Sequence, residues 1–327
     1  MRVVPRDEGA GAPPACGAKN QVAVTRVAAV DCGTNSIRLL VTDLADGLQH
    51  DVHREMRVVR LGEGVDRTGS LAPQAIARAR ASMVDYAALC RELEVERIRM
   101  VATSASRDAD NFEDFRATVV DVLGVEPDVI SGDEEAALSF AGATRTLDPV
   151  DGPFLVMDIG GGSTELVLGS AAVEAARSVD VGCVRLTERH LHSDPPTAGE
   201  VAAAVVDIDA AIEQVRAVVP VTHTRTAVGL AGSVTTIAAL SLGLSSYDRD
   251  QIHLSRLSRD DIDRVTADVL GMTLAARAAL PVMHPGRVDV IGGGALILRT
   301  LVDRLDLSDV LVSEADILDG IAWSLHA

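Results

Sequence analysis

Residues 154–169 read FLVMDIGGGSTELVLG: an apolar run, three consecutive glycines and a second apolar run. This pattern predicts a β-strand, a tight turn and a return strand, because short apolar runs bounded by glycine are typical of buried strands. Residues 25–44 have the same arrangement, with TRVAAVD and SIRLLVTDL on either side of the turn CGTN. Two hairpins of one kind, far apart in the chain, predict two similar structural units.

The two hairpins are related by a constant spacing of 127 residues, which carries Asp31 onto Asp158. Several matches in the same order, at nearly one spacing, predict a duplicated domain and not a short-period repeat protein. The other matching segments are Val101 with Val228, Ser106 with Ser233 and, at a spacing of 125, residues 59–61 with residues 184–186.

Helix and strand signatures alternate after the first hairpin, which predicts an α/β fold. We expect a flexible N-terminal extension over residues 1–24 and two domains over residues 25–150 and 151–327. The elements expected between the hairpins are strands over 53–62, 97–105 and 127–132 and helices over 72–94, 108–124 and 133–147.

The composition indicates a globular protein and excludes several classes of function. Of the 327 residues 47% are apolar, enough for two buried cores, and the net charge of -18 disfavours binding to nucleic acid. Lys19 is the only lysine, so neither a P-loop nor a pyridoxal-phosphate Schiff base can form in the folded part. No apolar run approaches the roughly 18 residues that span a bilayer, so we expect no membrane contact and a cytoplasmic location.

The two glycine turns are candidate phosphate sites, because successive backbone N–H groups in such turns converge on one point. The first turn adds the side chains of Thr34, Asn35 and Ser36 as donors, and in the second the glycines allow a phosphate to approach the backbone closely. The alternative is that the glycines serve turn geometry alone. The expected phosphate-binding residues of the second turn are Gly160, Gly161, Gly162, Ser163 and Thr164.

Two aspartates, Asp31 and Asp158, each end a strand just before a glycine turn. A carboxylate beside a phosphate is repulsive unless a cation lies between them, so the pattern predicts Mg²⁺ or another hard divalent cation. Glu165, on the return strand of the second hairpin, is expected to share this ion; its alternative is a solvated strand position.

Three strand-to-helix junctions carry further candidates. Arg107 opens a predicted helix and, with the helix N-terminus, can clamp a phosphate, although a surface arginine is the alternative. Gly232 and Ser233 occupy a similar junction. Glu134 and Glu135 stand in a first helical turn, where acidic residues commonly only complement the helix dipole. The glycines at 292–294 we interpret as close helix packing.

Several motifs together resemble the exopolyphosphatase and guanosine pentaphosphate phosphatase family over about residues 25–325. The resemblance implies two ribonuclease-H-like domains of the actin-like ATPase type with the active site in the cleft between them, no C-terminal HD-type helical module, and a homodimer. The motifs are DCGTNSIRLL, RLGEGVDRTG, ATSASRDADN, ISGDEEA, DIGGGSTEL, VGCVRLTER, LAGSVTT and HPGR.

The resemblance also implies roles for residues. Glu135 corresponds to the glutamate that orients or deprotonates the attacking water, with Glu134 as the neighbouring candidate. Asp158 and Glu165 look like the metal-binding carboxylates, Ser163 with its glycines like the phosphate grip, and Arg107 like the phosphate-clamping arginine.

The sequence therefore predicts an exopolyphosphatase that releases terminal orthophosphate from inorganic polyphosphate by metal-assisted attack of water. The nearest alternative is 5'-phosphohydrolysis of guanosine pentaphosphate (pppGpp), which the sequence does not separate from the first. An ATP-dependent kinase or ATPase shares the two hairpins, and a catalytically silent polyphosphate-binding protein is the remaining alternative.

Overall fold

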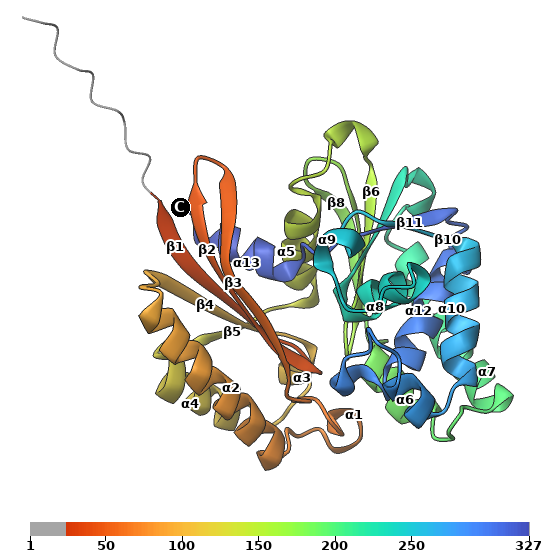
Figure 1. Ribbon diagram of the computed structural model, residues 1–327, viewed down its shortest axis with the longest axis horizontal. Helices are drawn as coiled ribbons and strands as arrows, with labels where there is room; N and C mark the ends of the chain where they lie inside the picture. The colour runs from red at the N-terminus through yellow and green to blue at the C-terminus, as the bar shows by residue number, and fades with distance from the viewer. Residues whose placement is uncertain (1–23, 327) are drawn as a thin grey trace, which may run out of the picture.

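The computed structural model describes residues 24–326 and contains two β-sheets (Figure 1). The first has the strand order β3-β2-β1-β4-β5, and the second has the order β10-β11-β9-β6-β7-β8. In both sheets an antiparallel hairpin leads to a third antiparallel strand on one side and to parallel strands on the other. This shared order confirms the predicted pair of actin-like α/β units.

The first sheet consists of β1 (Thr25–Cys32), β2 (Ser36–Ala45), β3 (Leu48–Val58), β4 (Arg97–Ala102) and β5 (Pro127–Val129). The second consists of β6 (Phe154–Ile159), β7 (Thr164–Gly169), β8 (Val173–Val179), β9 (Thr226–Leu230), β10 (Arg256–Ser258) and β11 (Asp309–Val312). The expected extension over residues 1–24 lies, except for Val24, outside the described residues.

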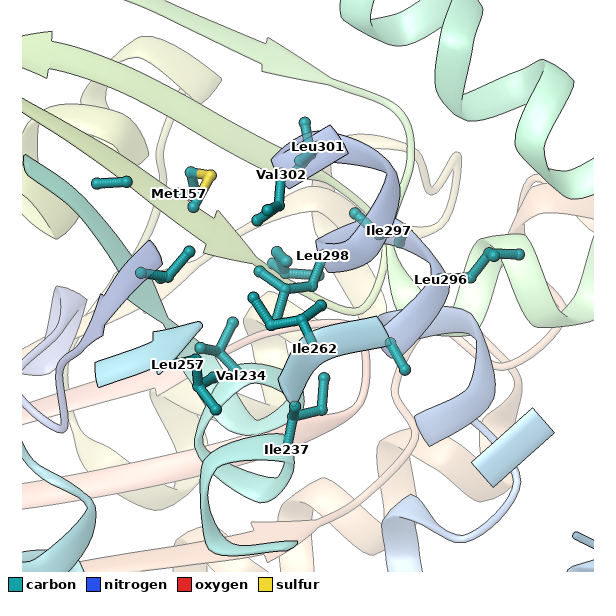
Figure 2. Packing of buried hydrophobic residues seen from close by; sticks show 14 of the residues in the cluster. Met157, Val234, Ile237, Leu257, Ile262, Leu296, Ile297, Leu298, Leu301 and Val302 are labelled. Carbon is teal, nitrogen blue, oxygen red and sulfur yellow. The ribbon is translucent and has the colours of Figure 1, made fainter. Parts of the chain in front are cut away.

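Helices cover the outer faces of both sheets (Figure 1). On the second sheet, Figure 2 shows how Met157 of β6, Ile262 of α10 and Leu298 of α12 come together in one apolar cluster. The outer helices are α2 (Pro73–Glu92) and α4 (Phe112–Leu123) on the first sheet and α7 (Ala198–Arg216), α8 (Ala231–Ser241), α10 (Arg259–Gly271) and α12 (Ile291–Arg304) on the second. The short helices are α1 (Val65–Thr68), α3 (Ser104–Arg107), α6 (Cys183–His190), α9 (Arg249–Ile252) and α11 (Leu274–Ala278).

Two helices fill the space between the sheets. Helix α5 (Gly132–Thr144), which follows the first sheet in the chain, packs on the second sheet, and α13 (Ile317–Ser324), from the end of the chain, packs on the first (Figure 1). They cross so closely that a Cβ on Gly142 would lie 1.9 Å from the carbonyl oxygen of Asp316. The residues of the first sheet precede the expected domain boundary and those of the second sheet follow it. Helices α5 and α13 each pack on the sheet from the other side of this boundary, and the boundary itself stays a prediction.

The strand expected over residues 53–62 is placed differently, since β3 begins at Leu48 and ends at Val58. Beyond Val58 the chain turns, with a positive φ at Arg60, and the N–H groups of Val59 and Arg60 donate to the carbonyl of Asn35 in the first glycine turn. The segment matched to it at a spacing of 125 does the same in the second half, where the N–H groups of residues 184 and 185 donate to the carbonyl of Gly161. The segments matched at a spacing of 125 residues therefore play the same part in both halves, since each hydrogen-bonds a backbone carbonyl of its glycine turn.

One further expectation concerns side-chain packing. The glycines at 292–294 lie inside α12, and a Cβ on Gly294 would lie 2.1 Å from Ser233 Oγ, which confirms their role in close helix packing. Cys32, Cys90 and Cys183 are buried free thiols. Within residues 24–326 every helix is too short or too polar to cross a bilayer.

Candidate active site

A small cavity of about 100 Å³ lies between the two glycine hairpins, at the ends of β1 and β6. It brings together most of the residues proposed from sequence, from four separate segments of the chain. Those that line it are Asp31, Thr34, Asn35, Ser36, Glu135, Asp158, Gly160, Gly161, Gly162, Ser163, Gly232 and Ser233.

Strand alternation explains why the aspartates face this cavity. In β1, Val27 and Ala29 point to the inner face of the first sheet, and Asp31 is the next residue with the same parity. In β6, Phe154 and Val156 point to the inner face of the second sheet, and Asp158 follows them. Each inner apolar row thus ends in a carboxylate where the strand reaches its glycine turn.

The residues opposite the two aspartates differ in charge. Arg38 is the cross-strand partner of Asp31, whereas Glu165 is the partner of Asp158. Residues directly opposite in an antiparallel pair have neighbouring side chains on one face. The duplication therefore gives the first hairpin an ion pair and the second hairpin two carboxylates.

The second hairpin holds its two carboxylates in an environment that penalises negative charge. Asp158 Oδ2 accepts a hydrogen bond of 2.6 Å from Ser139 Oγ, and Glu165 Oε1 accepts one of 2.7 Å from Ser178 Oγ. Burial, with a contribution from the Asp316 charge, raises the pKa of Asp158 to about 6 despite the Ser139 bond. Burial and the charges of Glu135 and Asp158 raise the pKa of Glu165 well above its ordinary range. Glu165 lies beneath the cavity and does not line it.

Glu135 lies at the cavity wall in the first turn of α5 and is paired with Arg107. Arg107 Nη1 donates to Glu135 Oε2 at 2.7 Å and to the carbonyl of Ile130 at 2.9 Å. Burial raises the pKa of Glu135 to about 7, since the opposing effect of Arg107 is smaller. Arg107 does not line the cavity; it is placed to orient Glu135.

The geometry distinguishes Glu135 from its neighbour Glu134. The Glu134 side chain is 48% exposed and accepts a hydrogen bond of 2.8 Å from Arg99 Nη2 on the surface. The Glu135 side chain is 11% exposed and borders the cavity. Of the two glutamates, only Glu135 is positioned to meet a molecule bound there.

Thr164 is the other expected binding residue that lies away from the cavity. Its hydroxyl donates to the carbonyl of Val181 at 2.5 Å, and the residue is 1% exposed. Thr164 is the first residue of β7, so its side chain is committed to holding the strand in place.

Two arginines line the cavity that sequence reasoning did not assign to the site. Arg38 donates to Asp31 at 2.7 and 2.9 Å and also pairs with Asp316. Arg287, in the motif HPGR, donates to the carbonyl of Gly232 at 3.1 Å and has no carboxylate partner among the described residues. The position of Arg38 opposite Asp31 in the first hairpin was a usable signal, and Arg287 lies in HPGR, one of the motifs that carry the family resemblance.

The residues present fit a divalent cation only in combination with a bound substrate. Among residues 24–326, no three His, Cys, Asp or Glu side chains form a ready metal cage, and Arg38 already balances the charge of Asp31. Asp158 and Glu165 remain as neighbouring buried carboxylates without a basic partner in the described chain. Mg²⁺ in proteins is commonly held by one or two carboxylates plus substrate phosphate oxygens and water, which matches this pair.

Comparisons with known proteins agree with the geometry. The profile of the Ppx/GppA phosphatase family matches residues 40–326. Exopolyphosphatase 2 of Mycobacterium tuberculosis is 53% identical over 317 residues, covering 93% of this chain and 99% of the relative. The guanosine-5'-triphosphate,3'-diphosphate pyrophosphatase of Vibrio cholerae is 28% identical, and the match covers 91% of this chain but 59% of that protein.

The fold is also similar to a solved structure. The crystal structure of an exopolyphosphatase-like protein superimposes with a TM-score of 0.88 at 41% identity, covering 91% of this chain and 98% of the other.

Proposed function

The chain belongs to the Ppx/GppA phosphatase family, and from this premise we propose that it is an exopolyphosphatase. It would release terminal orthophosphate from inorganic polyphosphate by attack of water. The observation that carries this proposal is the cavity in which two glycine turns enclose a phosphate-sized space beside Glu135. The match to an exopolyphosphatase over nearly the whole of both chains supports it.

The chain's own residues supply binding and positioning. The backbone N–H groups of Gly161 and Gly162 and the hydroxyls of Thr34 and Ser163 surround the terminal phosphate as donors, and Arg38 and Arg287 add positive charge at the wall. Phosphoryl transfer needs little covalent chemistry from the protein, so charge and alignment at this wall are the main contributions to catalysis.

We assign to Glu135 the role of orienting the attacking water and accepting its proton. Its pKa of about 7 makes it able to accept a proton near neutral pH, and its bond to Arg107 holds the carboxylate in one orientation. Asp158 and Glu165 are the proposed holders of Mg²⁺. When bound there, the ion neutralises charge on the phosphate oxygens that would otherwise be repelled by these carboxylates.

A second candidate, hydrolysis of pppGpp, is favoured by a neighbouring cavity of about 410 Å³. It shares Arg38 and Arg287 with the first cavity, and Met56 and Met283 contribute an apolar part. Such a volume lies in the range of small-molecule sites. The similarity to the Vibrio cholerae pyrophosphatase supports this candidate.

Phosphate release from polyphosphate, pppGpp and ATP, each with Mg²⁺ and with a chelator, separates the candidates. We expect Mg²⁺-dependent release from polyphosphate. Release from pppGpp alone would transfer the proposal to the second candidate, release from ATP alone would favour an ATPase, and release from none of them would contradict a phosphatase function for this site.

Location and assembly follow as proposals from the same family membership. We propose a cytoplasmic enzyme that forms a homodimer. Fractionation of cells and sedimentation of the purified protein would test the two statements separately.

A further inference from the structure

The two glycine turns, which come from opposite halves of the chain, touch each other directly. A Cβ on Gly161 would lie 2.9 Å from Thr34 Cβ, and one on Gly162 would lie 2.5 Å from Ser104 Oγ. In the described chain no hydrogen bond joins residues 33–36 to residues 160–163. The spacing of the two turns, which sets the width of the phosphate site, therefore depends on this packing and on hydrogen bonds from residues around the turns.

Arg185, on the short helix α6, contacts both the second turn and residues beside the first turn. Its Nε donates to the carbonyl of Gly162 at 2.7 Å, at the second turn. Its Nη2 reaches Ser104 Oγ at 3.4 Å, beside the first turn. The same guanidinium pairs with Asp66, at 2.6 Å from Nη1, and with Asp108 from Nη2, both in the first half of the chain.

These contacts use the geometry of a guanidinium. Arginine presents five N–H donors in a rigid plane, so one side chain can bond a carbonyl and two carboxylates in different directions at once. The Arg185 side chain is only 12% exposed, and its bond to the carbonyl of Gly162 is partly buried, whereas its two carboxylate partners remain accessible to water. A lysine ammonium at the end of a flexible chain cannot reproduce this set of directions.

In the neighbouring ion pairs between the two halves, the arginine side chain makes no hydrogen bond to a glycine turn. Arg189, one turn further along α6, binds the same Asp66 at 2.7 Å through Nε and Nη2 but makes no bond to residues 160–163. Arg60, which matches Arg185 at the spacing of 125 residues, pairs across the halves with Asp289 at 2.7 Å. Of these three arginines, Arg185 alone bonds a glycine turn through the same guanidinium that forms the cross-half ion pair, since Arg60 contacts the first turn only through its backbone N–H.

We propose that Arg185 is a positioning residue, which holds the Gly162 turn at the correct distance from the first turn so that both grip one phosphate. The proposal rests on the proposed function for the identity of the ligand. Arg185 is not placed to touch the phosphate itself, because it binds the outer carbonyl of the turn.

The test compares Arg185→Met with the matched control Arg189→Met, which removes a neighbouring arginine and an Asp66 ion pair. We measure the KM and kcat for polyphosphate and, independently of turnover, the tripolyphosphate concentration that gives half of the maximal rise in melting temperature with Mg²⁺. Losing bonds from a charged donor should raise the KM and this concentration about tenfold in Arg185→Met. Arg189→Met should stay within about twofold of the wild type, since it leaves the turn in place.

A purely structural role would give a different result. In that case Arg185→Met would lower the melting temperature without ligand but leave the KM and the tripolyphosphate response like those of Arg189→Met, and the inference would be overturned. If Arg185→Met does not fold, Arg185→Lys serves instead, because it retains charge but not the planar fork; a wild-type response from it would equally overturn the inference.

The two proposals can fail separately. A wild-type protein that releases no phosphate, yet is stabilised by tripolyphosphate in an Arg185-dependent manner, would remove the proposed function and retain the positioning role. A wild-type protein that tripolyphosphate does not stabilise would overturn the positioning role.

Discussion

Gly142→Ala should loosen the crossing of α5 and α13, on which both halves of the site depend. The added Cβ would lie 1.9 Å from the carbonyl oxygen of Asp316 and 2.9 Å from the backbone nitrogen of Gly320. Carbon and oxygen normally approach to about 3.3 Å, so the helices must separate by more than about 1 Å. Overpacking of this kind costs about 1–3 kcal/mol, while alanine in place of a helical glycine returns up to about 1 kcal/mol.

The net loss of up to about 2 kcal/mol should lower the melting temperature by up to about 3 °C, because the entropy of unfolding of a chain of this size is large. Activity should fall further than the unfolded fraction explains, because α5 carries Glu135 and the residue contacted, Asp316, holds Arg38. Thermal unfolding gives the change in melting temperature. Phosphate release, measured well below the melting temperature, gives the change in activity.

Gly271→Ala is the matched control, since a Cβ there meets nothing within 4 Å. It should be neutral or slightly stabilising. If Gly142→Ala had a melting temperature and a rate equal to those of the control, the close crossing of the two helices would not constrain the site as we infer.

Three further results are expected. Glu135→Gln should reduce phosphate release by roughly 10²–10⁴-fold while the exposed control Glu134→Gln stays near wild type; equal rates in the two variants would exclude Glu135 from the mechanism. Burial raises the pKa values of Asp158 and Glu135 from 3.8 and 4.5 to about 6 and about 7, so their stabilising effect is complete below about pH 4 and is lost as the pH rises to 7. The melting temperature in chelator should therefore fall over this range and Mg²⁺ should restore it more at pH 8 than at pH 5, whereas a flat profile would contradict the burial of these charges. Arg107→Met removes a group that lowers the pKa of Glu135, so the acid limb of the rate profile should move to higher pH; an unshifted limb would mean that the pair does not control this proton.

Local patterns in the sequence determined the hairpins and the placement of their aspartates. A strand-turn-strand unit spans about sixteen residues, and period-two alternation decides which side chains share a face. Asp31 and Asp158 could therefore be predicted to border the same kind of glycine turn, and the spacing of 127 residues predicted the second unit from the first. The fold class followed from the same observations.

The tertiary structure alone decided which charges meet. Arg38 and Asp316 are 278 residues apart in the chain, and Arg185 finds Asp66 at a separation of 119. An ion pair needs only that two side chains reach one point, so neither residue type nor local spacing identifies the partner. The same holds for Arg107, which turned out to bind Glu135 and not to line the cavity.

What the sequence by itself determined is the chemistry that each short segment carries: glycine turns with converging N–H groups, carboxylates at strand ends and a pair of glutamates at a helix start. What only the tertiary structure decided is how these segments are joined into one site, through the crossing of α5 and α13 and the ion pairs between the halves. The physical reason is range, because backbone geometry is set by neighbouring residues, whereas packing and charge pairing depend on segments that meet only after the chain has folded.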